Sequence, residues 1–302
     1  MSLRLALEIG GTKFQAALGE AGGRIIRADR CGVRGDLDEQ VSILEALARK
    51  VLAGEAVERV GIGFGGPVNL ATGRVVLSHH VAGWGDFPLV EWAQRNFGVP
   101  CAIENDTNAG ALAEATLGAG RGGRVVVYSN IGSGIGGGLV IDGRLHNGRL
   151  GAFEIGHTKL WDKESGQYVI VEHLCSGWSI NRIARQRAAA GAMPRVLALA
   201  GGEVAAISAE QVGRAASAGD EPARELVREV AENYAIALCN VITLVNPDRV
   251  VIGGGVSLMG DVFFQPLRAA VARQVFDLYR DNYQILPAGL GENVVLVGAL
   301  LL

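Results

Sequence analysis

The sequence predicts an α/β fold built from two related halves, and three observations support this prediction. Short apolar stretches alternate with segments of helical spacing along the 302 residues. A strand, a glycine-rich turn and a second strand occur twice, at residues 3–18 and 125–141, and aligning them places Gly10 over Gly132. The 44 glycines have no repeat period and accompany only eight prolines, which indicates tight turns and close ligand approaches.

The composition excludes several classes of protein. The chain is long enough for two domains, or one large one, with a substantial core. A net charge of -3 provides no basic surface for nucleic acid or for a membrane. No apolar run approaches the roughly 18 residues that span a bilayer, and the first residues predict a strand and not a signal peptide. The four cysteines lack paired spacing, which favours a reducing, cytoplasmic compartment.

Apolar periodicity predicts the remaining elements. Strands are expected at residues 3–9, 14–18, 24–28, 60–68, 99–103, 125–131, 137–141 and 249–252. Helices are expected at residues 37–52, 89–97, 109 onward, 169–187 with an interruption at 176–177, 193–200, 208–218, 221–244, 261–276 and 293–302.

The two glycine-rich turns are candidate phosphate sites. The backbone amides of Gly10 and Gly11 can point into a concavity, where Thr12 and Lys13 add a hydroxyl and a cation. An ordinary tight hairpin is the favoured explanation of this first turn when it is considered alone. The second turn carries Gly132, Ser133 and Gly134. Two such turns facing one another could hold both ends of a polyphosphate, which makes the pair a more specific signal than either turn.

The polar run at residues 104–108 lies where a strand is expected to pass into a helix. Side chains at the carboxyl end of a strand in an open α/β sheet can reach a ligand. Asp106 is therefore a candidate general base, and Asn105 could fix a polyhydroxylated ligand beside it. The alternative is that Asp106 or Thr107 caps the helix.

Five motifs in chain order resemble those of the ROK family of sugar kinases, which includes glucokinases, N-acylhexosamine kinases and fructokinase-like enzymes. They are Glu8-Ile-Gly-Gly-Thr-Lys13 for the first phosphate turn, Glu104-Asn-Asp-Thr-Asn-Ala109 around the catalytic aspartate, Ile131-Gly-Ser-Gly-Ile-Gly-Gly-Gly138 for the second phosphate turn, Glu154-Ile-Gly-His157 for sugar binding and Val251-Ile-Gly-Gly-Gly255 for adenosine. The resemblance implies an actin-like ATPase fold, of the hexokinase type, with two duplicated βββαβαβα cores. The small lobe would comprise residues 1–108, with the helix at 290–302 packing back on it, and the large lobe residues 109–289.

The resemblance also implies an activity. A hexose or N-acylhexosamine hydroxyl would be phosphorylated by ATP with Mg²⁺, and Asp106 would accept the hydroxyl proton. The implied sugar contacts are Gly66, His80, Asn105, Glu154, His157 and Glu172. The implied nucleotide contacts are Glu8, Gly10, Gly11, Thr12, Lys13, Gly132, Ser133, Gly134, Gly254 and Gly255. Because the family is often dimeric, a homodimer is expected.

One departure from the family pattern bears on catalysis. Glu8 stands where the family has an aspartate linked to magnesium and phosphate positioning. One extra methylene moves the carboxylate by about 1.5 Å, and Mg²⁺ tolerates little change in its octahedral geometry. The alternative function is therefore a sugar- or nucleotide-binding family member with weak or no kinase activity.

Other departures concern zinc, the sugar and the repressor branch of the family. The usual cysteine cluster is missing between His157 and Glu172, and Cys175 alone cannot complete a tetrahedral site, so no structural zinc is expected. His80 stands where the family commonly has asparagine, and Gly65 where it has proline. Ser133 replaces a threonine and keeps the hydroxyl. A sugar-responsive repressor is not expected, because such members carry a DNA-binding domain before the first phosphate motif.

Overall fold

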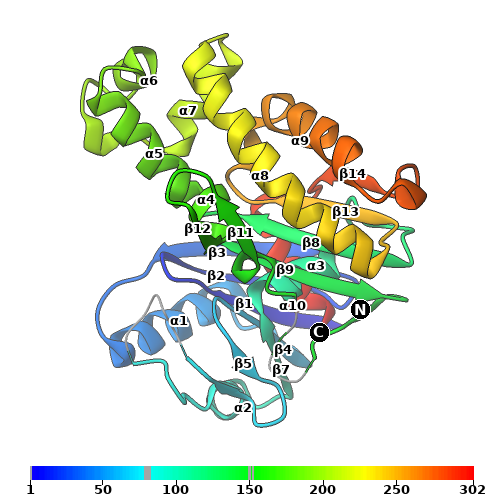
Figure 1. The fold of residues 1–302 in the computed structure, drawn as a ribbon. Helices are drawn as coiled ribbons and strands as arrows, with labels where there is room; N and C mark the ends of the chain where they lie inside the picture. Colours follow the sequence, from blue (N-terminus) through cyan, green and yellow to red (C-terminus); the bar gives the residue numbers. More distant parts are fainter. Residues whose placement is uncertain (1, 78–82, 149–150, 152) are drawn as a thin grey trace. The chain divides into compact units, whose positions relative to one another are not determined.

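Contacts within the chain divide it into two units. The computed structural model describes residues 2–77, 83–148, 151 and 153–302, so His80 lies outside the described residues. Unit 1 comprises Met1–Gly122, Gly138–Phe153 and Gly289–Leu302, and unit 2 comprises Gly123–Gly137 and Glu154–Ala288 (Figure 1). Unit 1 thus extends past residue 108, and the boundary between the expected lobes stays a prediction.

Unit 1 is built on a five-stranded sheet with the strand order β3-β2-β1-β4-β7. Its strands are β1 (Leu3–Ile9), β2 (Lys13–Glu20), β3 (Ile25–Gly32), β4 (Arg59–Phe64) and β7 (Cys101–Asn105). The strands β1, β2 and β3 form an antiparallel meander, whereas β1, β4 and β7 run parallel. The short strands β5 (Val68–Asn69) and β6 (Arg74–Val75) pair with each other, and β10 (Arg144–Leu145) pairs with the end of β9 (Ile135–Ile141).

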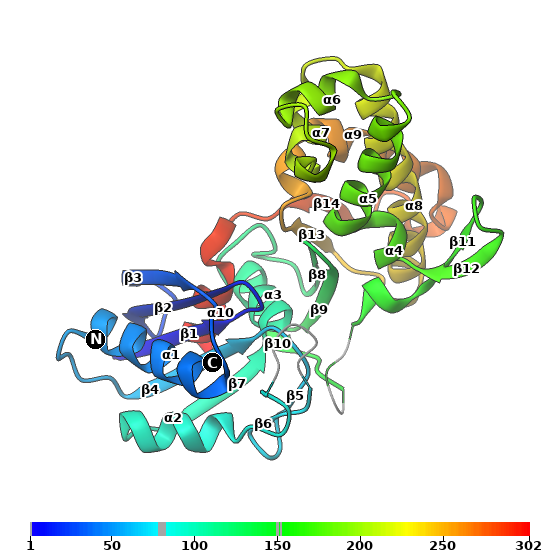
Figure 2. The ribbon, with the colours of Figure 1, turned by 90° about the vertical axis from the view of Figure 1, so that its left-hand side faces the viewer.

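Alternating side chains of β1 divide the core of unit 1 between the two faces of the sheet. Leu5 and Leu7 belong to a large apolar cluster with residues of α1 (Leu37–Leu52) and α2 (Leu89–Phe97). On the opposite face, Ala6 packs with residues of α10 (Val294–Leu301), which follows the 3-10 helix η5 (Gly291–Asn293). Figure 2 shows the strands of unit 1 with α1 and α2 beside them. The first face therefore carries the larger cluster, and the second combines alanines of β1 and β2 with leucines of α10.

Glycines bring α10 close to the sheet and to α3 (Asp106–Thr116). A Cβ on Gly61 of β4 would lie 1.9 Å from the carbonyl oxygen of Ala299. A Cβ on Gly298 of α10 would lie 1.9 Å from the carbonyl oxygen of Ala109 in α3. Only glycine allows backbones to approach this closely without a clash. These contacts fix α3, and with it the first residue of that helix, Asp106.

The second sheet has the strand order β10-β9-β8-β13-β14, and the change from unit 2 to unit 1 falls within β9. In unit 2, β8 (Val125–Ile131), β13 (Arg249–Gly253) and β14 (Gln284–Pro287) run parallel, and β11 (Lys159–Asp162) and β12 (Gln167–Ile170) form a separate antiparallel hairpin. The α-helices of unit 2 are α4 (Glu172–Cys175), α5 (Gly177–Ala189), α6 (Pro194–Leu199), α7 (Ala209–Ser217), α8 (Glu221–Val245) and α9 (Asp261–Gln274). Its 3-10 helices are η1 (Ile155–His157), η2 (Val204–Ala206), η3 (Ser257–Met259) and η4 (Asp277–Tyr279).

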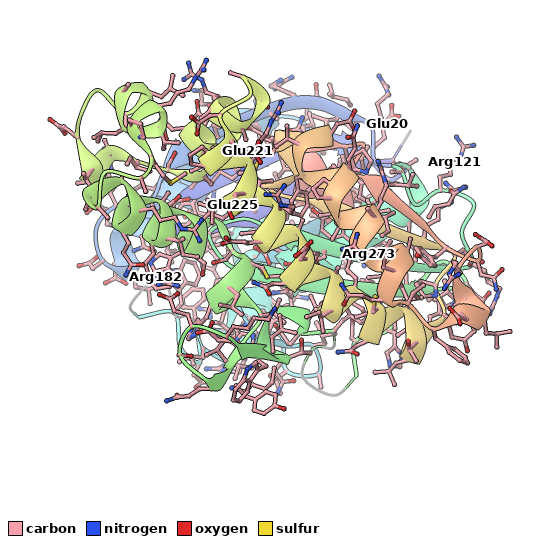
Figure 3. The ribbon with its side chains drawn as sticks, turned by 45° about the horizontal axis from the view of Figure 1, so that its top comes forward. Glu20, Arg121, Arg182, Glu221, Glu225 and Arg273 are labelled. Atoms are coloured by element: carbon pink, nitrogen blue, oxygen red, sulfur yellow. The ribbon has the colours of Figure 1, made fainter. Side chains whose placement is uncertain are left out.

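The two sheets repeat one topology. The order β3-β2-β1-β4-β7 becomes β10-β9-β8-β13-β14 when each strand is replaced by its counterpart from the second half. The predicted α/β fold with a duplicated core is thereby confirmed. Long α8 packs against α9, and charged residues such as Glu221, Glu225 and Arg273 stand exposed on these helices (Figure 3). Within the described ranges, every helix is too short or too polar to cross a membrane.

Two predicted elements are wrong at their ends. Residues 169–170 belong to strand β12 and not to a helix, because Val169 pairs with Leu160 and Ile170 with Lys159 of β11. The predicted interruption at residues 176–177 is confirmed, since Ser176 ends α4 and caps α5. The expected strand over residues 60–68 ends at Phe64, and the amide of Gly65 makes the last ladder bond to the carbonyl of Ile9 (2.8 Å). Val68 lies instead in the separate short strand β5, where it pairs with Val75 of β6.

The close backbone contact at Gly61 yields a stability prediction. Replacing Gly61 with alanine should lower the free energy of unfolding by about 1–3 kcal/mol or more, because the added methyl forces α10 away from β4. Urea unfolding monitored by circular dichroism measures the effect. The matched control is Gly22→Ala, where a Cβ would meet nothing within 4 Å and should change stability by no more than about 0.5 kcal/mol. Equal midpoints for the two variants would contradict the packing described.

Candidate active site

The first glycine turn joins β1 to β2 in unit 1. The amide of Gly10 donates to the carbonyl of Lys13 (3.1 Å), and the carbonyl of Thr12 accepts from the amide of Val33 (3.1 Å). The structure thus holds the predicted residues Gly10, Gly11, Thr12 and Lys13 in one turn between Ile9 and Phe14, which are paired strand ends. Gly65, at the end of the neighbouring strand β4, is tied to this turn through Ile9.

Glu8 precedes this turn as a buried carboxylate. Its Oε2 accepts a hydrogen bond from Nε2 of Gln15 (2.5 Å), and its Oε1 lies 3.6 Å from Nζ of Lys13. Removal from water raises the pKa of Glu8 above its ordinary value, while Lys13 and Gln15 act in the opposite direction. The Asp106 carboxylate adds to the increase, which means that the two carboxylates are within electrostatic reach of one another.

Asp106 is the first residue of α3, at the carboxyl end of β7. Its Oδ1 accepts from the amide of Thr107 (2.7 Å) and from the Thr107 hydroxyl (3.2 Å). Its Oδ2 lies near Gly65: a Cβ built on that glycine would be 3.4 Å from the oxygen. The N-cap of the helix is Asn105, whose Oδ1 accepts from the amides of Thr107 and Asn108, so the capping position does not fall on Asp106 or Thr107.

The side chain of Asn105 is hydrogen-bonded through both ends of its amide within unit 1. Besides capping α3, its Nδ2 donates to the carbonyls of Gly66 (3.2 Å) and Phe64 (3.5 Å). Two predicted sugar contacts, Asn105 and Gly66, are therefore in direct contact. An unpredicted neighbour, Glu104, is buried and accepts from the amide of Asn105 and from the side chains of Asn108 and Asn147. Its place next to Asn105 in the motif was the signal for this supporting role.

The second glycine turn, in unit 2, is supported by the start of α5. The amide of Gly132 donates to the carbonyl of Gly134 (2.9 Å), which closes the turn. The amides of Gly177 and Trp178 donate to the carbonyls of Gly132 (2.8 Å) and Ser133 (3.2 Å). Gly177 has to be glycine here, because a Cβ would lie 2.7 Å from the Gly132 carbonyl oxygen.

Glu172 also holds this second turn. Its Oε2 accepts from the amide of Ile135 (2.7 Å), and a Cβ on Gly134 would lie 2.5 Å from the same oxygen. A predicted sugar contact is thus hydrogen-bonded to the predicted phosphate turn.

In β8, the strand before this turn, Oγ of Ser129 accepts a hydrogen bond from the buried Tyr234 hydroxyl (2.7 Å), and burial raises the pKa of this phenol.

In unit 2, Glu154 precedes the 3-10 helix η1 and His157 is its last residue. Oε2 of Glu154 lies 3.6 Å from Nδ1 of His157, and both side chains are about two-thirds exposed (67% and 65%). The start of this helix is packed against β9, because a Cβ on Gly156 would lie 2.2 Å from the carbonyl oxygen of Ile135. Ile135 therefore contacts both the segment of the Glu154–His157 pair and Glu172.

Unit 2 contains a cavity of about 1020 Å³ beside the second glycine turn. Of the predicted nucleotide contacts, Gly132, Ser133 and Gly255 line it. Gly254 precedes Gly255 with a φ of +84°, a conformation that glycine adopts without strain. Sequence reasoning missed the walls that α5, α7 and η3 contribute, which are lined by Trp178, Asn181, Ser208, Gly213, Arg214, Leu258 and Met259 among others. No local motif marks these residues, because they meet only after the helices pack.

The segment between His157 and Glu172 folds without cysteines. It forms the β11–β12 hairpin, in which the exposed rings of Trp161 and Tyr168 pair across the strands with centroids 5.2 Å apart. Throughout residues 2–77, 83–148, 151 and 153–302, no three His, Cys, Asp or Glu side chains are grouped to hold a metal ion. The four cysteines are all free thiols.

Comparison with known proteins identifies the family. Residues 4–302 match the ROK family. The chain belongs to the ROK family. A glucokinase from Streptomyces coelicolor is 31% identical over 309 residues, covering 99% of this chain and 96% of that protein. The crystal structure of a ROK family glucokinase from Streptomyces griseus, in complex with glucose and AMPPNP, is 32% identical with a TM-score of 0.87, covering 99% of this chain and 98% of that one.

These similarities confirm the predicted resemblance and the actin-like ATPase fold. ROK relatives are not all enzymes. A xylose repressor from Caldicellulosiruptor bescii is 28% identical over 246 residues, covering 80% of this chain and 61% of that protein. The family alone therefore does not decide between catalysis and ligand sensing.

The bond from Glu172 to the second turn yields a prediction for hydrogen exchange. Glu172→Ala should speed exchange at the amide of Ile135 about tenfold or more, because a hydrogen bond to a charged acceptor is lost. Glu172→Gln keeps an acceptor oxygen at the same distance and should retain most of the protection. Unchanged protection of Ile135 in the alanine variant would show that Glu172 does not hold the turn.

Proposed function

We propose that this ROK protein transfers the γ-phosphoryl group of ATP to a hydroxyl of a hexose or N-acylhexosamine. The observation that carries the proposal is the position of Asp106. It starts α3 at the end of β7, beside Gly65 and within electrostatic reach of Glu8. The glucokinases that resemble this chain over nearly its full length support the same activity.

Asp106 would act as the general base. As the sugar hydroxyl oxygen forms its bond to the γ-phosphorus and the bond to the bridging oxygen of ADP breaks, the Asp106 carboxylate would take the hydroxyl proton. Half-buried, and anchored through Oδ1 by the amide and hydroxyl of Thr107, this carboxylate is held in one orientation. Such positioning supplies most of the catalysis in phosphoryl transfer.

The sugar site would combine carboxylates, amides and a histidine. Gly66, Asn105, Glu154, His157 and Glu172 are its proposed contacts, together with His80. Hydroxyl-rich ligands need many donors and acceptors, which these side chains provide. Because Asn105 is already bonded through both ends of its amide, it would contribute by shaping the backbone at Gly66 as well as by direct contact.

The nucleotide would bind through the two glycine turns and the cavity of unit 2. A cavity of about 1020 Å³ is large enough for a nucleotide, given that ligand pockets are commonly about 300–1,000 Å³. Gly132, Ser133 and Gly134 would face the phosphates, Gly254 and Gly255 the adenosine. In unit 1, Gly10, Gly11, Thr12 and Lys13 would form the second phosphate contact.

Glu8 fits a role beside Mg²⁺. Its raised pKa reflects a buried charge that Lys13 and Gln15 only partly compensate, and a divalent cation would complete the compensation. Mg²⁺ is commonly bound through one or two carboxylates and substrate phosphates, and it neutralises phosphate charge. Glu8 is the residue that would hold the ion, while Asp106 stays the proposed base.

The competing proposal is a protein that binds sugar or nucleotide without transferring phosphate. Two observations favour it: Glu8 replaces the family aspartate, and ROK relatives include a repressor. An ADP-release assay over a panel of sugars, glucose first, separates the two proposals. Turnover supports the kinase, whereas calorimetric sugar binding with no turnover in the wild type and in Glu8→Asp supports the binding protein. A cytoplasmic homodimer stays a prediction, which light scattering can test for its oligomeric part.

Asp106→Asn should lower kcat by about a hundredfold to ten-thousandfold and leave sugar binding largely intact. The asparagine keeps an Oδ1 acceptor for Thr107, so the start of α3 should be preserved while the base is lost. Steady-state kinetics and calorimetry measure the two effects. Asp36→Asn, at the N-cap of α1, is the matched control and should leave kcat unchanged. A near-native kcat for Asp106→Asn would remove its assignment as the base.

Trp178 should report nucleotide binding. Its indole is 55% exposed and lines the cavity, so AMPPNP with Mg²⁺ should change the tryptophan fluorescence. Trp178→Ala should remove most of this change and weaken AMPPNP binding about tenfold, since base–aromatic stacking contributes about 1–3 kcal/mol. Trp161→Phe, on the β11–β12 hairpin and also exposed, is the control that should preserve both signal and affinity. If AMPPNP binds with no change in Trp178 fluorescence and with equal affinity in Trp178→Ala, the adenine does not stack on Trp178.

A further inference from the structure

We propose that Gln15 is a positioning residue that holds the Glu8 carboxylate in the place where it serves the Mg²⁺–nucleotide complex. It rests on the proposed function and goes beyond it, because Gln15 would touch neither sugar nor nucleotide. By holding the carboxylate, Gln15 would allow a glutamate to take the role that an aspartate has in the family.

The sheet of unit 1 aligns the residues concerned in one row. Gln15 of β2 lies directly opposite Glu8 of β1, and it also lies opposite Arg30 of β3. Directly opposed residues of antiparallel strands point to the same face with Cβ atoms about 4.5–5.5 Å apart. The register alone therefore brings the Gln15 amide next to the Glu8 carboxylate.

The amide nitrogen of the Gln15 side chain donates two hydrogen bonds. Its Nε2 donates to Oε2 of Glu8 (2.5 Å) and to the carbonyl oxygen of Glu292 in η5 (3.4 Å). The side chain is only 4% exposed, so packing as well as hydrogen bonding fixes it. A donor held in this way binds a carboxylate without a further loss of side-chain freedom.

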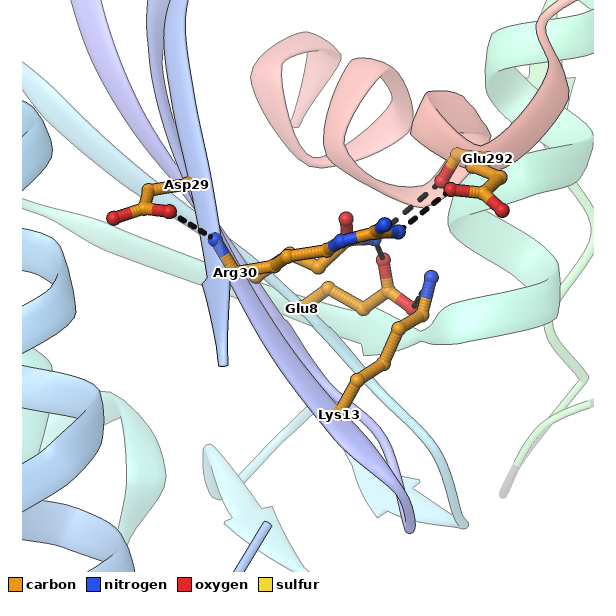
Figure 4. Close-up of polar contacts among 6 residues, drawn as sticks. Glu8, Lys13, Asp29, Arg30 and Glu292 are labelled. Atoms are coloured by element: carbon orange, nitrogen blue, oxygen red, sulfur yellow. Dashed lines mark hydrogen bonds and ion pairs between the residues drawn. The ribbon is translucent and has the colours of Figure 1, made fainter. Parts of the chain in front are cut away.

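The anchor of Gln15 is itself tied to the sheet. Nη1 of Arg30 lies 2.8 Å from Oε2 of Glu292, and the amide of Arg30 donates to Oδ1 of Asp29 (2.8 Å). Figure 4 shows this chain of contacts from Arg30 through Glu292 to the pair formed by Glu8 and Lys13. The ion pair is exposed and contributes little by itself, so the link between η5 and the buried row is mainly the bond from Gln15 to the Glu292 carbonyl.

The two carboxylate oxygens of Glu8 therefore have different partners. Oε2 is bound to Gln15, whereas Oε1 lies 3.6 Å from Nζ of Lys13, a residue of the glycine turn. An aspartate would be shorter by one methylene, about 1.5 Å, and would fall short of Gln15. The hydrogen bond is therefore specific to glutamate at this position.

A double-mutant cycle tests this coupling. The variants are Gln15→Met, which keeps length and removes the amide, Glu8→Asp, and the combination. The readout is the Mg²⁺ concentration that half-saturates binding of AMPPNP, measured by calorimetry on the full chain. Gln15→Met should raise it about tenfold in the wild-type background, as loss of a residue that orients a metal ligand does. In the Glu8→Asp background the same change should be no more than about twofold.

A matched control separates positioning from stability. Gln40 of α1 is also buried, accepting from Nε1 of Trp84 (2.8 Å) and donating to the carbonyl of Gly35 (2.9 Å). Gln40→Met should lower the unfolding midpoint and leave the Mg²⁺ dependence unchanged. Gln15→Asn, which shortens the side chain and retains an amide, serves as a second variant should Gln15→Met unfold, and its effect should also depend on Glu8.

Three outcomes would overturn the proposal: Gln15→Met having equal effects in both backgrounds, its having no effect on Mg²⁺ dependence, or wild-type AMPPNP binding that ignores Mg²⁺. The sugar KM should not change in Gln15→Met, because the Gln15 side chain donates its hydrogen bonds to Glu8 and Glu292, which are not among the proposed sugar contacts. If the wild type phosphorylates no sugar, the kinase proposal fails, while the Mg²⁺ titration still measures the coupling between Gln15 and Glu8.

Discussion

The place of Asp106 depends on the close packing of α3 against α10. At Gly298 the two backbones approach so closely that a Cβ would lie 1.9 Å from the Ala109 carbonyl oxygen, and a Cβ on Gly63 of β4 would lie 3.7 Å from Cα of Asp106. A larger residue at Gly298 would push α10 away from α3, whereas the distance at Gly63 is the ordinary van der Waals contact by which the start of α3 packs on the sheet. Glycine costs the unfolded chain entropy on folding, yet here it sets the distance between Asp106, Gly65 and the first turn.

The two glycine turns share a topology but differ in their surroundings. The first lies beside buried or half-buried carboxylates, Glu8 and Asp106, and beside Lys13. The second is held by the first residues of α5 and by Glu172, and it opens on a cavity with an exposed indole. The duplicated framework therefore carries a cluster of charged side chains at one turn and an open cavity at the other.

Much of the fold and part of the site could be predicted from local patterns. The strands around Gly10 and Gly132, the break at residues 176–177 and the passage from strand to helix across residues 104–108 all follow from short-range composition, although the helix starts at Asp106 and not at the expected residue 109. The errors have a common cause. Val169 forms a strand because Leu160 lies opposite it, and Val68 leaves the strand from residue 60 to pair with Val75. Partners distant in the chain decide such positions, and neither partner carries a motif of its own.

The sequence by itself determined the duplicated α/β framework, the two glycine turns and the aspartate at the end of a strand, because each is encoded by neighbours in the chain. Only the tertiary structure decided that Asn105 caps α3, that Glu172 clamps the second turn, and that Gln15 reaches Glu8. These contacts depend on sheet register and on helix packing. Both are set by the burial of surfaces contributed from distant segments, which no short stretch of sequence contains.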